Sequence, residues 1–271
     1  MTPCTADNAW RDRLASLLLN HEYSSSPRGM PVFEQLHRTI VVDIERSLIT
    51  HPLRKLNYRF AAAEALWIMN GDDRVEPLAK YNKRMREFSD DGVVLAGAYG
   101  PRLEPQINYI INALRRDRDT RQAVASIWLP NPGPSKDIPC TLSLSFMIRG
   151  DALHAHAFMR SSDVWLGVPY DLFSFACFAS MIAALYNDCA GVEPVGLGRL
   201  HLTAASSHLY AEHQEQAAAI VAAEPSERSF AWPVEAVRSG EPGRIAEYLT
   251  DMIDSGLPEW PRTAPQSSDA G

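Results

Sequence analysis

The chain has 271 residues, of which 46% are hydrophobic and 22% charged, and its net charge is −7. This composition is typical of a globular protein with a sizeable core, and the acidic balance argues against a protein that binds nucleic-acid polymers. The four cysteines have no CxxC spacing, which argues against a zinc site or a disulfide framework. We expect a cytoplasmic protein without a membrane segment, because the first residues lack a signal pattern and the longest apolar stretch is too short to span a bilayer.

Residue patterning predicts seven helices, over 7–20, 60–70, 75–88, 104–116, 171–188, 208–222 and a segment around Ile245, Leu249 and Met252. Asp7 is the expected N-cap of the first helix, and Gly71 the expected end of the second. The Ser-, Pro- and Gly-rich segment 21–30, which carries Arg28, is predicted to be a loop.

Three strands are predicted in the middle of the chain. One covers 122–129 and is stopped by Pro130, and two others, 141–148 and 152–159, alternate with period two around Arg149-Gly150-Asp151 as a hairpin. No repeat or linker interrupts the pattern. The sequence therefore predicts one α+β domain over 1–271, with a polar tail after about residue 260.

The residues that offer chemistry flank this hairpin. Cys140 follows Pro139 at the start of the first hairpin strand, where a lone cysteine is more often a packing residue than a nucleophile. After the second strand, the segment Arg160-Ser161-Ser162-Asp163 offers a guanidinium fork and hydroxyl donors, which suit a phosphate. Taken alone, the same segment is better explained as a strand-end turn with a surface arginine.

The order of these motifs resembles the thymidylate synthase family. The central match is Pro-Cys, a hairpin, and then Arg160-Ser-Ser-Asp-Val-Trp-Leu-Gly-Val-Pro-Tyr-Asp171 opening an apolar helix. Further matches, in order, are Arg28 in a phosphate-binding loop, Glu64-Ala-Leu-Trp67, Ala98-Tyr99-Gly100, Arg121 on a strand before the cysteine, and His208-Leu209-Tyr210. The resemblance spans roughly residues 28 to 213.

The resemblance implies a thymidylate synthase-like α+β fold, a mixed sheet packed with helices, and a homodimer through the sheet. It also implies a pyrimidine nucleotide substrate and 5,10-methylenetetrahydrofolate as co-substrate. Cys140 would add to C6 of the pyrimidine, and Glu64 would move protons through ordered water. The other implied roles are phosphate binding by Arg28, Arg160, Ser161 and the partner subunit's Arg121, sugar binding by His208 and Tyr210, and folate binding by Asp163, Gly167 and Tyr99.

One departure from the family pattern bears on the base. Thymidylate synthases carry Asn where this chain has Asp171, and deoxycytidylate hydroxymethylases of the same fold carry Asp. A carboxylate accepts a hydrogen bond from the cytosine amino group, so we predict a cytidine nucleotide. The competing interpretation is an Asp that caps the following helix.

Three further departures favour a more hydrated folate pocket and thus hydroxymethylation: Tyr81–Met85 in place of a Trp-rich segment, Thr141 after the cysteine, and a polar C-terminal end. Near His208, the small residues Ala204, Ala205 and Ser206 leave room for a ribose. The chain also resembles a bacterial CMP hydroxymethylase of nucleoside-antibiotic biosynthesis more than the phage deoxycytidylate enzymes. We therefore predict CMP in preference to dCMP. Gln122, where a second arginine is usual, removes one phosphate donor.

Three alternatives stay open at this point. The chain could be a thymidylate synthase that methylates dUMP, or a catalytically silent relative that binds nucleotide. A metal site at His154-x-His156 or at His208 and His213 is disfavoured, because no acidic or cysteine partner clusters nearby in the sequence.

Overall fold

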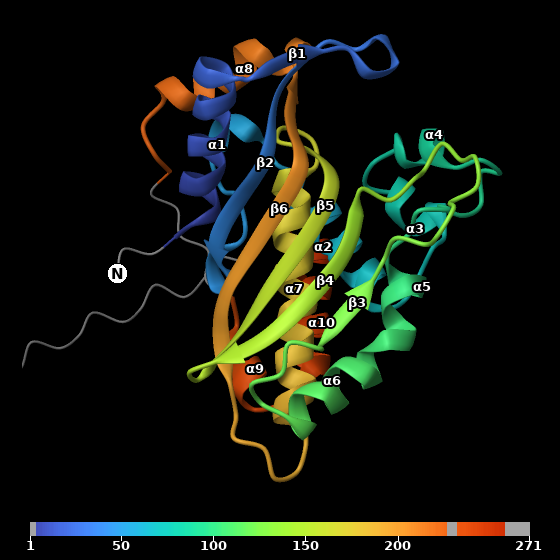
Figure 1. The fold of residues 1–271 in the computed structure, drawn as a ribbon, viewed down its shortest axis with the longest axis vertical. Helices are drawn as coiled ribbons and strands as arrows, with labels where there is room; N and C mark the ends of the chain where they lie inside the picture. Colours follow the sequence, from blue (N-terminus) through green and yellow to red (C-terminus); the bar gives the residue numbers. More distant parts are fainter. Residues whose placement is uncertain (1–3, 227–231, 258–271) are drawn as a thin grey trace, which may run out of the picture.

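The computed structural model describes residues 4–226 and 232–257, and its strands form one six-stranded sheet (Figure 1). The strands are β1 (Tyr23–Ser25), β2 (Val32–Asp43), β3 (Val124–Ser126), β4 (Thr141–Arg149), β5 (Ala152–Asp163) and β6 (Gly196–Tyr210). Their order across the sheet is β1-β2-β6-β5-β4-β3, and the neighbours are antiparallel except β5 and β6, which are parallel. The predicted α+β class with a mixed sheet is confirmed.

Helices pack on one side of this sheet and along its edges. They are α1 (Ala6–Asn20), α2 (Tyr58–Met69), α3 (Val75–Ala79), α4 (Met85–Phe88), α5 (Gly100–Leu103), α6 (Ile107–Arg116), α7 (Val168–Asn187), α8 (Gln214–Ala222), α9 (Val234–Arg238) and α10 (Pro242–Ser255). In Figure 1, α7 runs behind the sheet with α2 and α10, α1 lies beside β2, and α6 lies near β3. The predicted polar tail after about residue 260 lies outside the described residues.

The long helix α7 is the centre of the core. It is apolar all round because the sheet, α2, α9 and α10 surround it, and Phe173, Phe175 and Phe178 are fully buried. By length and composition it is the one helix among the described residues that could cross a membrane, and 83% of its apolar window is buried inside the protein. We therefore interpret α7 as a core helix, as its sequence predicts.

Several helix and strand boundaries follow the sequence. Asn57 caps α2 by accepting a hydrogen bond from the Phe60 backbone N–H at 3.1 Å, and Gly71, with φ of 67°, ends it. The hairpin of β4 and β5 turns at Gly150, with φ of 56°. The helix predicted around Ile245, Leu249 and Met252 is α10, and all three residues are buried.

Other predictions are wrong at this level. Thr5, not Asp7, caps α1, and Asp7 instead accepts hydrogen bonds from the Thr50 and His51 backbone at 3.0 and 2.9 Å. The segment 75–88 forms two short helices, and the strand predicted over 122–129 is confined to β3. The segment 21–30 contains the short strand β1, and the helix predicted over 208–222 begins only at Gln214.

A row of three exposed residues, His37, Ala205 and Arg160, crosses β2, β6 and β5 at one level of the sheet. His37 has φ of 51°, a left-handed conformation inside a strand. Before the row the buried side chains include Met159 and Ala204, and beyond it they include Ser162 and Ser207. On each strand the two buried positions are three residues apart, whereas a regular strand would place them two or four apart. The alternation of buried and exposed side chains therefore shifts by one residue at the row.

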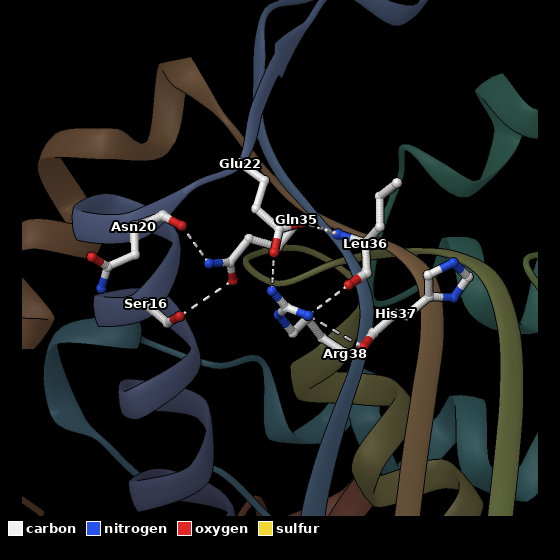
Figure 2. Close-up of polar contacts among 7 residues, drawn as sticks. All are labelled: Ser16, Asn20, Glu22, Gln35, Leu36, His37 and Arg38. Carbon is white, nitrogen blue, oxygen red and sulfur yellow. Dashed lines mark hydrogen bonds and ion pairs between the residues drawn. The ribbon is translucent and has the colours of Figure 1, made fainter.

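The shifted alternation determines which way the strand ends face. Gln35 points toward α1, where its side chain bonds to the Asn20 carbonyl at 2.5 Å and to Ser16 at 3.2 Å (Figure 2). Its register partners are Ser207 and, one strand further, Ser162. The next row therefore faces away from α1, and this row consists of Glu34, His208 and Asp163.

Candidate active site

Cys140 lies immediately before β4 and is held there by Arg160. The Arg160 backbone N–H donates to the Cys140 carbonyl at 2.8 Å, and its guanidinium donates to the carbonyls of Ile138 and Pro139, both at 2.9 Å. The half-buried thiol thus lies in a fixed loop next to a cation. This arrangement suits a nucleophile better than a packing residue.

Burial raises the pKa of the Cys140 thiol above its ordinary value. Arg160 opposes this rise, the carboxyl groups of Asp171 and Asp137 add to it, and Arg28 again opposes it. The two arginines predicted to hold a phosphate are therefore close enough to favour the Cys140 thiolate. The structure brings Cys140, Arg160 and Arg28 together, although Arg28 lies on an exposed turn with φ of 54°.

Glu64 projects from the middle of α2 toward α7. Burial raises the pKa of its carboxyl to about 7, and the Ser174 hydroxyl, 3.5 Å away, opposes the rise. A carboxyl of this pKa exchanges protons readily at neutral pH, which is the property required of a general acid or base. Ser174 is a neighbour that the sequence patterns did not single out.

Asp171 lies in the first turn of α7, within reach of Glu64 and Cys140. Burial raises the pKa of its carboxyl well above the ordinary value, and the neighbouring Glu64 and Asp163 raise it further. The N-cap of α7 is Gly167, so the interpretation of Asp171 as a helix cap is wrong. A Cβ atom at Gly167 would lie 3.2 Å from Asp171 Oδ2, so the glycine lets the Asp171 carboxyl approach the backbone closely.

Tyr99 belongs to the same group of side chains. Its ring stacks on Phe175 of α7 with centroids 6.1 Å apart. Burial raises the pKa of its hydroxyl well above the ordinary value, and the nearby Asp171 and Cys140 contribute. Tyr99 therefore stays a neutral hydrogen-bonding group beside the thiol. Its predicted contact with folate stays a prediction.

Asp163 and His208 form a register pair between β5 and β6, and the Val164 N–H donates to the His208 carbonyl at 2.8 Å. The His208 ring meets the Tyr210 ring edge-on, with centroids 5.3 Å apart. These two residues thus lie on a strand rather than on the helix predicted from the sequence. Two residues before this pair, Ser161 of β5 lies opposite Ser206 of β6. The predicted phosphate and sugar residues therefore share one end of the sheet.

Arg121 lies elsewhere. It is exposed in the segment before β3, at the far edge of the sheet from β6 and beyond β4 and β5. The action of Arg121 in another subunit stays a prediction.

A carboxylate, an aromatic ring and a cation suited to a pterin lie next to each other. Asp163 Oδ1 accepts from the backbone N–H groups of Trp165 and Leu166 at 2.8 and 3.0 Å, and a carboxylate has further acceptor positions. The Arg54 guanidinium lies 4.9 Å from the centroid of the Trp165 ring, and its buried Nε has no hydrogen-bond partner among the described residues. This donor and acceptor set fits a flat heterocycle with an anionic tail. The sequence patterns did not reveal Arg54, because only the fold brings it to Trp165.

The histidines considered as metal ligands are separated. His154 and His156 lie near His201 on the open face of the sheet, beside a cavity of about 280 Å³, whereas His208 lies with Asp163. His213 stacks on Trp165 with centroids 5.7 Å apart. Among residues 4–226 and 232–257 no group of three or more His, Cys, Asp or Glu residues is placed to hold a metal.

Comparison with known proteins identifies relatives of this arrangement. Residues 9–236 match the family model described as thymidylate synthase. A curated relative, the deoxyuridylate hydroxymethyltransferase of Bacillus phage SP01, is 34% identical over 176 aligned residues, which cover 58% of this chain. The chain spans less than half of that relative's length, since the aligned part is 44% of it.

Proposed function

This chain belongs to the thymidylate synthase family, and from this premise we propose that it is a cytidylate 5-hydroxymethyltransferase. In this proposal a one-carbon unit from 5,10-methylenetetrahydrofolate is attached to C5 of CMP and hydrated. The nucleotide gains CH2O overall, and tetrahydrofolate is released. The observation that carries the proposal is the partly buried Asp171 carboxyl near the Cys140 thiol.

Cys140 is the proposed nucleophile. Its thiolate forms a bond to C6 of the pyrimidine, and the electron pair of the C5–C6 double bond moves to C5, which becomes the nucleophilic carbon. Arg160 and Arg28 support the thiolate against the effect of burial. The bond between sulfur and C6 breaks again when the product forms, so the thiol is restored.

Asp171 is the proposed reader of the base. Burial raises the pKa of its carboxyl and so favours the protonated form, which has one O–H donor and one carbonyl acceptor. The acceptor pairs with the cytosine amino group, and the O–H donates to ring N3. A protonated Asp171 carboxyl also removes one of the two negative charges near the Cys140 thiolate, the other being that of Asp137. Glu64, with a pKa of about 7, is the proposed carrier of the proton released from C5, through ordered water.

The rest of the nucleotide is assigned to the end of the sheet. We expect Arg28, Arg160 and Ser161 to hold the 5′-phosphate and His208 and Tyr210 to contact the sugar. Arg121 is proposed to reach the phosphate of the partner subunit, which makes the active protein a homodimer. The small residues Ala204 and Ala205 support ribose over deoxyribose, hence CMP over dCMP.

Bound folate would supply the one-carbon unit. Asp163, Gly167 and Tyr99 are the predicted contacts, and Arg54, which lies over the Trp165 ring, joins them on the geometry described above. Asp163 would accept from the N–H groups of the pterin, and Arg54 would attract the anionic tail. These residues orient the co-substrate against C5 of the base.

A second candidate substrate is dUMP, which the name of the phage relative favours. A protonated Asp171 can also pair with uracil, with its O–H donating to O4 and its carbonyl accepting from N3–H. An ionised Asp171 cannot donate to O4, yet it still accepts from the cytosine amino group. Cytosine is therefore the base that this carboxyl accommodates in both protonation states.

Mass analysis of products decides between these candidates. The protein is incubated with 5,10-methylenetetrahydrofolate and separately with CMP, dCMP and dUMP, with Cys140→Ser as the inactive variant and Cys189→Ser as its matched control. A gain of CH2O on CMP, lost in Cys140→Ser alone, supports the proposal. The same gain on dUMP alone would favour the second candidate, and a methyl gain on dUMP would indicate thymidylate synthesis. No product and no release of tritium from 5-tritiated CMP would indicate a silent binder.

A further inference from the structure

We propose that Glu34, held by Ser206, accepts a hydrogen bond from the ribose 2′-hydroxyl and thereby selects ribonucleotides. This inference rests on the proposed function, because it takes His208 and Tyr210 as the neighbours of the sugar. Glu34 comes from β2, shortly after Arg28 in the sequence and far from the other residues that the motifs identify. It deepens the proposal by assigning the choice between CMP and dCMP to a named carboxylate.

The register of the sheet places Glu34 beside His208. Glu34 on β2 lies opposite His208 on β6, and His208 lies opposite Asp163 on β5. The three side chains form one row across three strands, on the face away from α1. The carboxylates of Glu34 and Asp163 are both close enough to act electrostatically on the His208 imidazole, in agreement with this row.

Two serine hydroxyls orient the Glu34 carboxylate. Ser206 donates to Oε1, and Ser25 donates to Oε2 at 3.2 Å. Each carboxylate oxygen has two acceptor positions, so a further donor can bind each oxygen after both serine contacts are made. The carboxylate is half-buried, so its direction is determined by these partners rather than by free rotation in water.

The 2′-hydroxyl is the one sugar donor that distinguishes CMP from dCMP. A hydrogen bond to a charged acceptor is stronger than one between neutral groups, and a site built around it discriminates against a ligand that lacks the donor. Ala205, which is exposed and directly precedes Ser206 on β6, presents only a methyl group on this part of the strand. A hydrogen bond from the 2′-hydroxyl to Glu34 therefore favours CMP over dCMP.

The test compares Glu34→Gln with Glu22→Gln. The Glu22 carboxylate comes from the same corner of the sheet, but it pairs with Arg38 and with the Leu36 N–H at 3.1 Å (Figure 2). Both variants remove one negative charge, so they differ in whether the lost carboxylate faces His208. We measure kcat/KM for CMP and dCMP, and also the equilibrium dissociation constants of both nucleotides without folate.

We expect Glu34→Gln to lower the CMP-to-dCMP ratio of kcat/KM about tenfold, mainly through KM for CMP, while Glu22→Gln changes the ratio less than about twofold. Ser206→Ala, which keeps the carboxylate but removes its holder, should lower the ratio by a smaller factor. An unaltered ratio in Glu34→Gln would overturn the inference. If the wild-type protein converts no cytidine nucleotide, the proposed function fails, and the dissociation constants alone test the role of Glu34. Tighter binding of CMP than of dCMP, lost in Glu34→Gln, would support that role. Equal binding of both nucleotides by the wild type would refute it.

Discussion

The Nε atom of Arg160 donates to the carbonyl oxygen of Pro139 at 2.9 Å, on the residue immediately before Cys140. A second guanidinium nitrogen donates to the Ile138 carbonyl at 2.9 Å. The planar fork of an arginine thus fixes the loop that carries the thiol, while its charge favours the thiolate. A single side chain therefore links the position of the nucleophile to its ionisation.

Replacing Arg160 with lysine should separate these two functions. Lysine keeps the positive charge but lacks the fork, so we expect KM for the nucleotide monophosphate to rise about tenfold and the loop to become less rigid. The measurement is steady-state kinetics together with the pH dependence of Cys140 alkylation. Arg149→Lys, at the exposed end of β4, is the control. A KM within about twofold of the wild type in Arg160→Lys would contradict this role.

Asp171→Asn should change the preferred base. An amide donates to uracil O4 and accepts from N3–H. To pair with cytosine, the amide would have to turn over, so that its oxygen faces the amino group and its N–H faces N3. We expect kcat/KM for CMP to fall roughly a hundredfold and turnover of a uridine nucleotide to appear or increase. Parallel assays with CMP and dUMP measure this.

The same variant has a signature in the pH profile. The raised pKa of Asp171 means that the wild-type carboxyl loses its proton as the pH rises through that pKa, and with it the bond to cytosine N3. The uracil reaction of the wild type should therefore decline with rising pH more steeply than the cytosine reaction. Asn has no proton to lose, so this limb should be absent from Asp171→Asn. Parallel profiles for wild type and variant would argue against the assignment.

Glu64→Gln should remove a pH-dependent part of the stability. The folded-state pKa, about 7, lies above the ordinary value of 4.5, so the stability that this group contributes is complete below about pH 4.5 and is lost as the pH rises through 7. We expect the free energy of unfolding of the variant to exceed that of the wild type by more at pH 8 than at pH 5, and these two excesses should differ by about 1–3 kcal/mol. The activity of the variant should fall at least about a hundredfold. Urea unfolding at the two pH values measures the difference. Glu76→Gln, at an exposed position on α3, should show no such change.

Arg121 provides a test of the shared site. If Arg121 completes the partner's phosphate site, Arg121→Ala and Cys140→Ser are each inactive alone, and mixed dimers contain one intact site. Random re-association should restore about a quarter of the wild-type activity per subunit, as expected for a two-fold symmetric interface. Refolding the two variants together and assaying CMP turnover measures this. An inactive mixture, with dimers present by sedimentation, would show that Arg121 acts elsewhere.

The sequence by itself determined the local features. The position of Cys140 before a hairpin, the end of α2 at Gly71 and the apolar face of α10 each depend on residues within a few positions of one another, where turn chemistry and periodicity apply. The motif from Arg160 to Asp171 likewise indicated that the end of a strand leads into an apolar helix. These features are local, so the pattern of residue types is sufficient to predict them.

Contacts between distant residues were decided only by the tertiary structure. Asp7 looks like a helix cap but binds Thr50 and His51, and the segment after His208 resembles a helix although the residue itself lies on β6. The strands β2 and β6 were not predicted. The row of His37, Ala205 and Arg160 shifts the alternation of buried and exposed residues on which strand prediction depends. Glu34 reaches His208, and Arg54 reaches Trp165, because sheet register and helix packing bring together residues far apart in the chain.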